Sequence, residues 1–398
     1  MTNFTSANSG INHLTNANQI DPINSANRPT TASSDQYNHV NSITPQIEER
    51  FLTVRSPQSA DIIYLNSDNL TARDSTNQTV VSANDEGTVS EPLTTHSESL
   101  NDDAARIAQL TVTRVNPALG AEVRGLDLTK PMGTDLAKHI EGLIADHQVL
   151  VIKNQSNITA HQQVAFTEHF GSVEAHPLGA RKAYDNKDIP PSVLVVKNPM
   201  NATHKSTIRN DYWHSDLSCL EEPVSLSVLR AIAIPATGWG DTMFANMYRA
   251  YNNLTPGMRD LCHKLNAVHN TDHYFDPKRS SETFIHKAEN IHPVVRTHAI
   301  TSKNSLFLSD SFIDRFEGMT HEESRPLLNQ LIKHSTEPHN VYRHRWEAGD
   351  MVVWDNRCTM HYAVFDYEPG QPRHLERTTA SGERPFQAQS DETSGFNK

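Results

Sequence analysis

The segment DYWHSDLSCL places a histidine and an aspartate, His214 and Asp216, two positions apart behind a tryptophan. Residues two apart share one face of an extended chain, whereas on a helix they point in nearly opposite directions. An extended segment would therefore let both side chains bind one metal ion. The alternative is a structural hydrogen bond between the imidazole and the carboxylate.

The same His-x-acid pattern also begins at His96, His139, His321 and His374. His139 and His321 lie in predicted helices, which separate the two side chains, and His96 lies in a polar N-terminal region. A metal site at His214 and Asp216 requires a third ligand. The best candidate is His361, which follows the apolar segment MVVW.

Two imidazoles and one carboxylate form the facial triad of non-haem Fe(II) sites, which leave positions open for a co-substrate and O2. A closed structural zinc site would require a fourth ligand, which is not apparent. A zinc hydrolase with a metal-bound water and a barrel without metal remain as alternatives.

Two arginines, Arg373 and Arg377, follow in the predicted strand RHLERTTA. Because they are four residues apart, they face the same way on a strand. Such a pair is usually a solvated face, but its position after a candidate metal ligand favours two anion-binding side chains at a shared site.

The folded region begins near residue 106. Residues 1–105 are rich in Asn, Ser and Thr and contain few aromatics, which predicts a disordered polar tail. Residues 106–390 are predicted to form the domain, and 391–398 a C-terminal tail. A cytoplasmic protein is expected because no leader or membrane span is evident and the three cysteines match no disulfide framework. The net charge of -12 argues against nucleic acid as a partner.

The domain is predicted to be α+β. Helices are expected over 134–147, 158–172, 254–269 and 319–328, and strands over 110–115, 148–153, 192–197, 225–234, 306–310, 344–355 and 373–380. Capping boxes are predicted at Thr159 with Gln162 and at Thr320 with Glu323. In the helix expected over 254–269, Thr255 is the predicted N-cap and Pro256 takes the first helical position. The face of this helix that is predicted to be core extends to Val268.

Residues from about 108 to 388 resemble the taurine dioxygenase and 2,4-dichlorophenoxyacetate dioxygenase family of Fe(II)- and 2-oxoglutarate-dependent oxygenases. The segments that carry the resemblance are GAEVRGLDLTKP, HFGSVEAHP, DYWHSDLS, GWGDTMFANM, HPVVRTHAIT and WDNRCTMHYAVFDY with RHLERTT. The resemblance implies a distorted double-stranded β-helix, a relative of the jelly roll, with flanking helices.

The resemblance also implies roles for individual residues. It assigns iron to His214, Asp216 and His361, and the distal carboxylate of 2-oxoglutarate to Thr242 and Arg373. The residues that it implies for the substrate are Arg377 and His176 on the sulfonate, the amide of Asn210, the backbone N–H of Leu217, and the aromatic walls Phe275 and Phe312. Gly179 and Arg209 depart from the taurine pattern. An added cation at Arg209 is unfavourable beside an ammonium group, which favours an organosulfonate or alkyl sulfate over taurine itself.

The implied activity is a dioxygenase that uses Fe(II), 2-oxoglutarate and O2 to hydroxylate a small anionic substrate. Succinate and CO2 would form, and a taurine-like sulfonate or an alkyl sulfate would release sulfite or sulfate. A phenoxyacetate-like or other carboxylate substrate is the alternative, because Arg377 could hold it equally well, and a homo-oligomer is left open.

Overall fold

The computed structural model describes residues 95–175, 188–198, 211–236, 238–272, 287–367 and 371–388, with side chains from residue 102 onward. All of them fall within one unit, Gly87–Lys398. The helices are α1 (Thr95–Gln109), α2 (Thr134–His147), α3 (Ala160–Glu168), α4 (Met247–Asn252), α5 (Pro256–His263), α7 (His321–Ser335) and the 3-10 helix η1 (Pro338–Asn340). The strands are β1 (Thr111–Arg114), β2 (Ala121–Arg124), β3 (Val149–Ile152), β4 (Leu194–Asn198), β5 (Leu226–Ala233), β6 (Thr242–Asn246), β7 (Asn266–Asn270), β8 (Glu289–Pro293), β9 (Val295–Thr297), β10 (Asn304–Leu306), β11 (Ile313–Phe316), β12 (Val341–His344), β13 (Met351–Asp355), β14 (Thr359–Ala363) and β15 (Arg373–Ala380). The mixed α and β content agrees with the predicted class.

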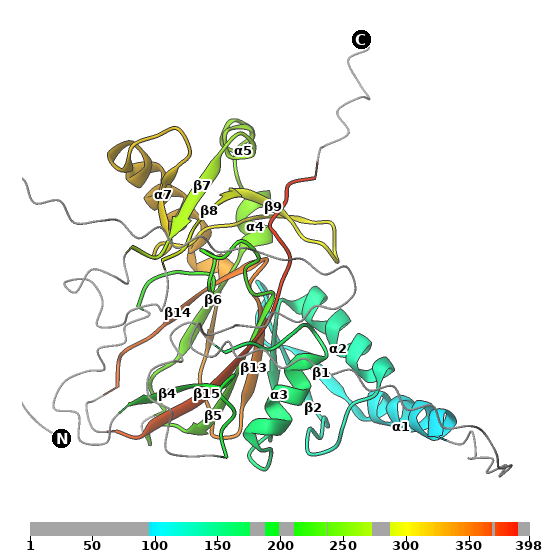
Figure 1. The fold of residues 1–398 in the computed structure, drawn as a ribbon. Coiled ribbons are helices and arrows are strands. Elements are labelled where there is room, and N and C mark those ends of the chain that lie inside the picture. The colour runs from blue at the N-terminus through cyan, green and yellow to red at the C-terminus, as the bar shows by residue number, and fades with distance from the viewer. Residues whose placement is uncertain are drawn as a thin grey trace, which may run out of the picture. The chain divides into compact units, whose positions relative to one another are not determined.

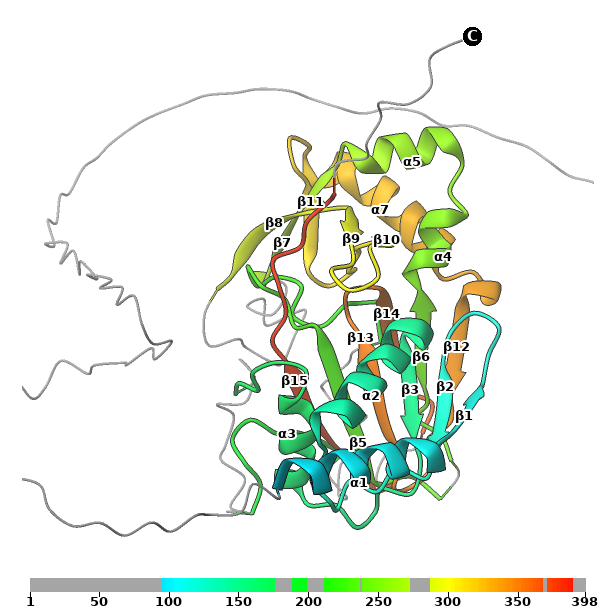
Figure 2. The same cartoon turned by 90° about the vertical axis from the view of Figure 1, so that its right-hand side faces the viewer.

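The main sheet has seven strands in the order β1-β2-β3-β13-β5-β15-β4, and only β2 and β3 run parallel (Figure 1). The central strands of this sheet are apolar on both faces, because helices cover one face and a second sheet covers the other. On one face Leu150 and Val353 pack with Ile140 of α2 and Phe166 of α3. Figure 2 shows α1, α2 and α3 lying across this side of the sheet.

The opposite face of the main sheet packs against a second sheet, β12-β6-β14. Val352 and Trp354 of β13 and Leu229 of β5 share a buried cluster with Phe244, which lies at the centre of β6. The alternation of Val353 toward the helices with Val352 and Trp354 toward the second sheet follows the two-residue period of a strand. The strand β14, which carries His361, is thereby fixed beside this core.

A second apolar core lies among β7, β9, β10, β11 and the helices α4, α5 and α7. The prediction of one helix over 254–269 is wrong in its second half. The helix ends at His263, and residues 266–270 form β7 because they pair with β8 and β11. Strand pairing buries Val268 at 2% exposure, whereas Leu261, predicted as core, is 37% exposed.

The helix starts follow the sequence closely. Both capping boxes are confirmed: Thr159 pairs with Gln162 at α3, and Thr320 with Glu323 at α7. Thr255 is the N-cap of α5 and Pro256 follows it, but the threonine side chain makes no capping hydrogen bond.

Two strand predictions need correction. Strand β10 ends at Leu306, and residues 307–310 form a loop instead of continuing the predicted strand. The predicted strand over 344–355 is two strands, β12 and β13, separated by a turn at Gly349, where φ is +85°. The two strands join different sheets, which a single strand could not do.

The N-terminal boundary predicted at residue 106 falls inside α1. Asp103 of this helix accepts hydrogen bonds from the backbone N–H groups of Gly133 and Leu136, at 3.1 and 3.2 Å, where α2 begins. The Asp103 carboxylate thus caps the N-terminus of α2, whose N-cap residue, Gly133, has no side chain to do so. Residues 1–94 and 389–398 lie outside the described residues, so the predicted tails stay predictions. Among the described residues no helix is both long and apolar enough to cross a membrane.

Candidate active site

His214, Asp216 and His361 converge in the interior. One ligand atom from each lies within 4.8 Å of the others, and all three residues are buried. The structure thus joins a loop before β5 with the middle of β14, segments that lie far apart along the chain.

Backbone pairing holds the two histidines together. The N–H of His214 donates to the carbonyl of His361 at 3.0 Å, and the N–H of His361 donates to the carbonyl of His214 at 2.8 Å. His214 is extended, as predicted, and the chain turns at Asp216. Leu217 follows with a φ of +49°, a conformation that costs a branched residue about 1–2 kcal/mol.

The protonation states suit a divalent metal. Burial would raise the pKa of Asp216, but the adjacent Arg377, His361 and His214 outweigh it and lower that pKa below its usual value. Burial lowers the pKa of His214, and burial together with His214 lowers that of His361. Two neutral imidazoles and one carboxylate at neutral pH are what metal binding requires.

The imidazole rings of the two histidines are oriented so that their Nε2 atoms are available to a metal ion. Nδ1 of His214 lies 2.9 Å from the carbonyl of Tyr212, so it carries the proton and leaves a lone pair on Nε2. Nε2 of both histidines lies 3.8 Å from Oδ1 of Asp216, which is too far for a hydrogen bond. A structural imidazole–carboxylate hydrogen bond, the alternative that the sequence left open, is therefore not formed.

A second cluster, His298, Asp355 and Cys358, shows the contrast. Nδ1 of His298 accepts from the N–H groups of Ile300 and Thr301, so Nε2 carries the proton and donates to Asp355 at 2.9 Å. Arg357 donates to both oxygens of the same carboxylate. The polar atoms of this cluster satisfy one another, as expected of a structural network.

Arg377 lies directly beside the triad. Its Nη1 donates to Oδ1 of Asp216 at 2.9 Å, and its side chain is 9% exposed. Arg373 and Leu375 of the same strand are also buried, and β15 pairs with β4 in an unbroken register, so its side chains alternate regularly. The two arginines therefore share one face of β15, as their spacing predicts.

Arg373 is buried but forms no ion pair within the described part of the chain. It donates to the carbonyl of Gly240 at 3.1 Å, and its guanidinium lies over the ring of Tyr367. Thr242, two residues after Gly240, begins β6 and accepts from Trp346 Nε1 at 3.0 Å. A buried guanidinium without a carboxylate partner is suited to an anionic co-substrate.

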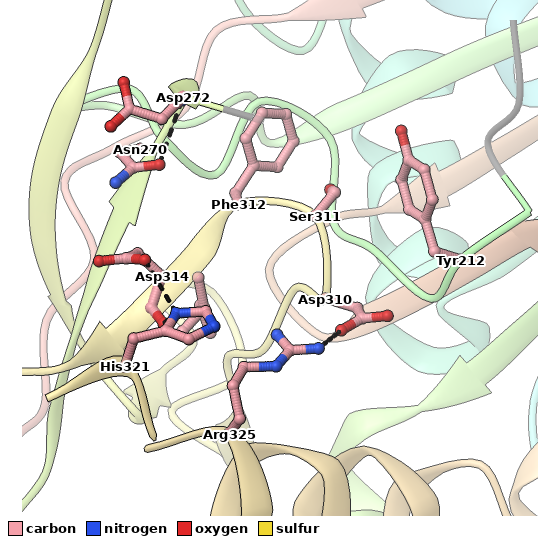
Figure 3. Close-up of a pocket in the computed structure, with 10 residues that line it drawn as sticks. Tyr212, Asn270, Asp272, Asp310, Ser311, Phe312, Asp314, His321 and Arg325 are labelled. Carbon is pink, nitrogen blue, oxygen red and sulfur yellow. Dashed lines mark hydrogen bonds and ion pairs between the residues drawn. The ribbon is translucent and has the colours of Figure 1, made fainter. Parts of the chain in front are cut away.

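A cavity of about 170 Å³ is lined in part by Tyr212, whose ring lies 5.2 Å from that of His214, although no residue of the triad lines the cavity itself. Figure 3 shows Phe312 and Tyr212 around it, with the ion pair between Arg325 and Asp310. The lining residues are Tyr212, Asn270, Asp272, Asp310, Ser311, Phe312, Ile313, Asp314, His321 and Arg325. Phe312 also packs in one cluster with Leu217. The structure thus brings two predicted substrate residues together near the metal site.

The other predicted substrate residues lie outside the described residues. These are His176, Asn210 and Phe275, together with the two departures from the taurine pattern, Gly179 and Arg209. Their assignments stay predictions.

Two residues that the sequence analysis missed contact Asp216. Ser227 donates to Oδ2 of the carboxylate at 2.7 Å, and Asn356 accepts from its backbone N–H at 3.2 Å. Ser227 is a polar residue within the apolar run VSLSVL, which was a usable signal. Asn356 follows β13 in WDNR, where an asparagine is easily taken for a turn residue.

Fold and site together define a class. Two imidazoles and a carboxylate with open positions are the ligand set of non-haem Fe(II) oxygenases, and the buried arginines supply sites for anions.

The comparisons with known proteins agree with this class. The family model described as taurine catabolism dioxygenase TauD, TfdA family matches residues 107–379. The chain is 33% identical over 293 residues to an alpha-ketoglutarate-dependent sulfate ester dioxygenase of Pseudomonas putida, covering 71% of this chain and 93% of that protein. It is 31% identical to an alpha-ketoglutarate-dependent 2,4-dichlorophenoxyacetate dioxygenase of Cupriavidus pinatubonensis, covering 67% and 95%. A crystal structure of a taurine dioxygenase from Burkholderia xenovorans superposes with a TM-score of 0.57 at 30% identity, covering 70% of this chain and 91% of the other.

The chain belongs to the TauD, TfdA family. It is a non-haem Fe(II)- and 2-oxoglutarate-dependent dioxygenase.

Proposed function

We propose that this dioxygenase acts on a small organosulfonate or alkyl sulfate without a nearby ammonium group. The observation that carries the proposal is the buried guanidinium of Arg377 beside the metal carboxylate, because a fixed cation at this place favours an anionic substrate. The similarity to a sulfate ester dioxygenase supports a sulfur oxyanion as that group.

The proposed roles follow from the contacts. His214, Asp216 and His361 would hold Fe(II), which supplies the activation of O2 at the expense of 2-oxoglutarate. Arg373 and Thr242 would hold the distal carboxylate of 2-oxoglutarate. The substrate residues would be Arg377, His176, Asn210, the N–H of Leu217, and the rings of Phe275 and Phe312.

The proposed reaction balances. One atom of O2 enters succinate as 2-oxoglutarate loses CO2, and the other hydroxylates the carbon that bears the sulfonate or sulfate group. The hydroxylated carbon then becomes an aldehyde as it releases sulfite or sulfate. The chain contributes orientation through the arginines and exclusion of water through the buried walls around the triad.

A carboxylate substrate of the phenoxyacetate kind is the second candidate, and the similarity to the 2,4-dichlorophenoxyacetate dioxygenase favours it. A guanidinium binds a carboxylate in the same bidentate way, so Arg377 serves either substrate.

The test is a substrate panel with Fe(II), 2-oxoglutarate and O2. Taurine, unsubstituted alkanesulfonates, alkyl sulfates and phenoxyacetates are compared by the succinate, sulfite and sulfate that they release. We expect alkanesulfonates or alkyl sulfates to give the highest turnover, and taurine to be poorer than an alkanesulfonate of similar length. Succinate formed only with carboxylates would overturn the substrate class but not the dioxygenase. Replacement His361→Ala controls for product formed without the site.

We further propose that the main sheet and the sheet β12-β6-β14 are the two walls of a distorted double-stranded β-helix, which the shared core around Phe244 supports. The cytoplasmic location and a homo-oligomer stay proposals, which cell fractionation and light scattering would test.

A further inference from the structure

Ser227 and Asn356 form a closed ring of hydrogen bonds with Asp216. Ser227 Oγ donates to Oδ2 of Asp216 at 2.7 Å, and Asn356 Nδ2 donates to Ser227 Oγ at 2.9 Å. The ring closes where Oδ1 of Asn356 accepts from the backbone N–H of Asp216 at 3.2 Å. Ser227 is fully buried and Asn356 is 1% exposed, so water does not compete for these groups.

The partners of Asn356 determine which group donates and which accepts at each hydrogen bond of the ring. Oδ1 of Asn356 accepts a second hydrogen bond, from Nε1 of Trp354 at 3.1 Å. Both of these partners are N–H groups that can only donate, so the amide has one possible orientation, with its nitrogen toward Ser227. Since that nitrogen donates to Ser227, the single hydroxyl proton of the serine is left for Asp216.

The ring distinguishes the two oxygens of Asp216. Oδ2 accepts from Ser227, while Oδ1 faces Nε2 of both His214 and His361 at 3.8 Å. Arg377 also donates to Oδ1, but a carboxylate oxygen has a further lone pair for a metal ion.

We propose that Ser227 and Asn356 are positioning residues for the metal centre. They hold the Asp216 carboxylate so that Oδ1 alone is offered to the metal, and they keep the bidentate arrangement from forming. This inference rests on the proposed metal role of Asp216. Substitution of a residue that hydrogen-bonds to a metal ligand typically weakens metal affinity about 10–100-fold.

Two substitutions test the ring of hydrogen bonds. Ser227→Ala removes the donor to Asp216. Asn356→Leu keeps the approximate size of the side chain without adding charge, but removes the donor to Ser227 and the acceptor for the backbone N–H of Asp216. Ser225→Ala is the matched control, because Ser225 is also a buried serine, immediately before β5, and donates to the backbone carbonyl of Ser381 at 2.8 Å, away from the carboxylate.

The experiment is a titration of the metal-free full chain with Co(II), without 2-oxoglutarate, read by the visible absorption of the bound ion. We expect Kd to rise about 10–100-fold for Ser227→Ala and Asn356→Leu, and to stay at the wild-type value for Ser225→Ala. Thermal midpoints of the metal-free proteins are measured alongside. A weakened Kd with an unchanged midpoint supports a positioning role, which a purely structural role would not produce.

Asp216→Ala separates this inference from the proposed function. If Asp216→Ala abolishes Co(II) binding while Ser227→Ala and Asn356→Leu bind like wild type, the positioning role is overturned and the metal site stands. Equal losses of Co(II) affinity in the variants at Ser227, Asn356 and Ser225 would also overturn the positioning role. If Asp216→Ala binds Co(II) like wild type, the metal role itself fails.

Discussion

Nη1 of Arg377 lies 2.9 Å from Oδ1 of Asp216, so the side chain proposed to hold the substrate also contacts a proposed metal ligand. The contact joins substrate recognition to the metal centre through a single guanidinium. It also explains why burial does not protonate Asp216, since Arg377 is the largest of the influences that lower its pKa.

Replacement Arg377→Ala should therefore weaken turnover of the substrate without weakening metal binding. Loss of the anion partner should lower kcat/KM by about 100-fold or more. Removal of a cation next to a divalent ion should leave Co(II) affinity unchanged or increase it, because like charges repel. Steady-state kinetics and Co(II) titration check the two halves.

The control for this substitution is Arg384→Ala, whose side chain is 67% exposed and pairs with Glu221 at the surface. It should resemble wild type in both measurements. A tenfold loss of metal affinity in Arg377→Ala, with kcat/KM nearly intact, would mean that Arg377 serves the metal site alone.

A pair of glycines tests the 2-oxoglutarate site. Gly240 and Gly238 both have positive φ, +88° and +70°, so alanine at either place strains the backbone by about 1 kcal/mol. A Cβ at Gly240 would meet Nε of Arg373 at 2.8 Å, whereas one at Gly238 meets nothing within 4 Å. Gly240→Ala should displace Arg373 and raise the KM for 2-oxoglutarate at least about tenfold, and Gly238→Ala should not.

The readouts for the two glycine variants are the KM for 2-oxoglutarate and the thermal midpoint. Similar midpoints with different KM values would support the contact with Arg373. The assignment of Arg373 fails if both variants bind 2-oxoglutarate as wild type does.

Stability should fall on acidification because of His292. Burial, the main cause, lowers its pKa from 6.5 to about 4, and Arg296 and Arg384 add to the effect against a hydrogen bond to Leu220. A histidine that is neutral when folded stabilises the protein fully above pH 6.5, and this contribution declines as pH falls from 6.5 toward 4. The slope approaches about 1.4 kcal/mol per pH unit.

Urea unfolding of the metal-free protein at pH 6.5, 5.5 and 4.5 measures this slope. His292→Gln should lose stability less steeply than wild type over this range, by up to about 1.4 kcal/mol per pH unit. The exposed His161, replaced by glutamine, is the control and should keep the wild-type slope. Parallel curves for His292→Gln and wild type would show that His292 does not contribute.

Some of this site could be predicted from sequence because its chemistry is carried by residue types at local spacings. His214 and Asp216 are two apart on an extended segment, and Arg373 and Arg377 are four apart on a strand, so simple periodicity placed each pair on one face. Helix caps were equally local, as Thr159 and Thr320 show.

Other features depend on contacts between distant segments. The end of α5 at His263 is set by the pairing of β7 with β8 and β11, which overrides the helical spacing of the apolar residues. The ring of Asp216, Ser227 and Asn356 joins the loop before β5, the strand β5 and the turn after β13. Only the folded sheet brings these polar groups into hydrogen-bond distance.

His214, Asp216 and His361 should form an open Fe(II) site that also accepts 2-oxoglutarate. Anaerobic titration of the metal-free chain with Fe(II) and then 2-oxoglutarate tests it most directly. We predict a weak visible charge-transfer band that requires both additions, saturates at a single Fe(II) per chain, and is lost in His214→Ala and His361→Ala. A wild-type chain that gives no such band, or a band that survives both substitutions, would contradict the account.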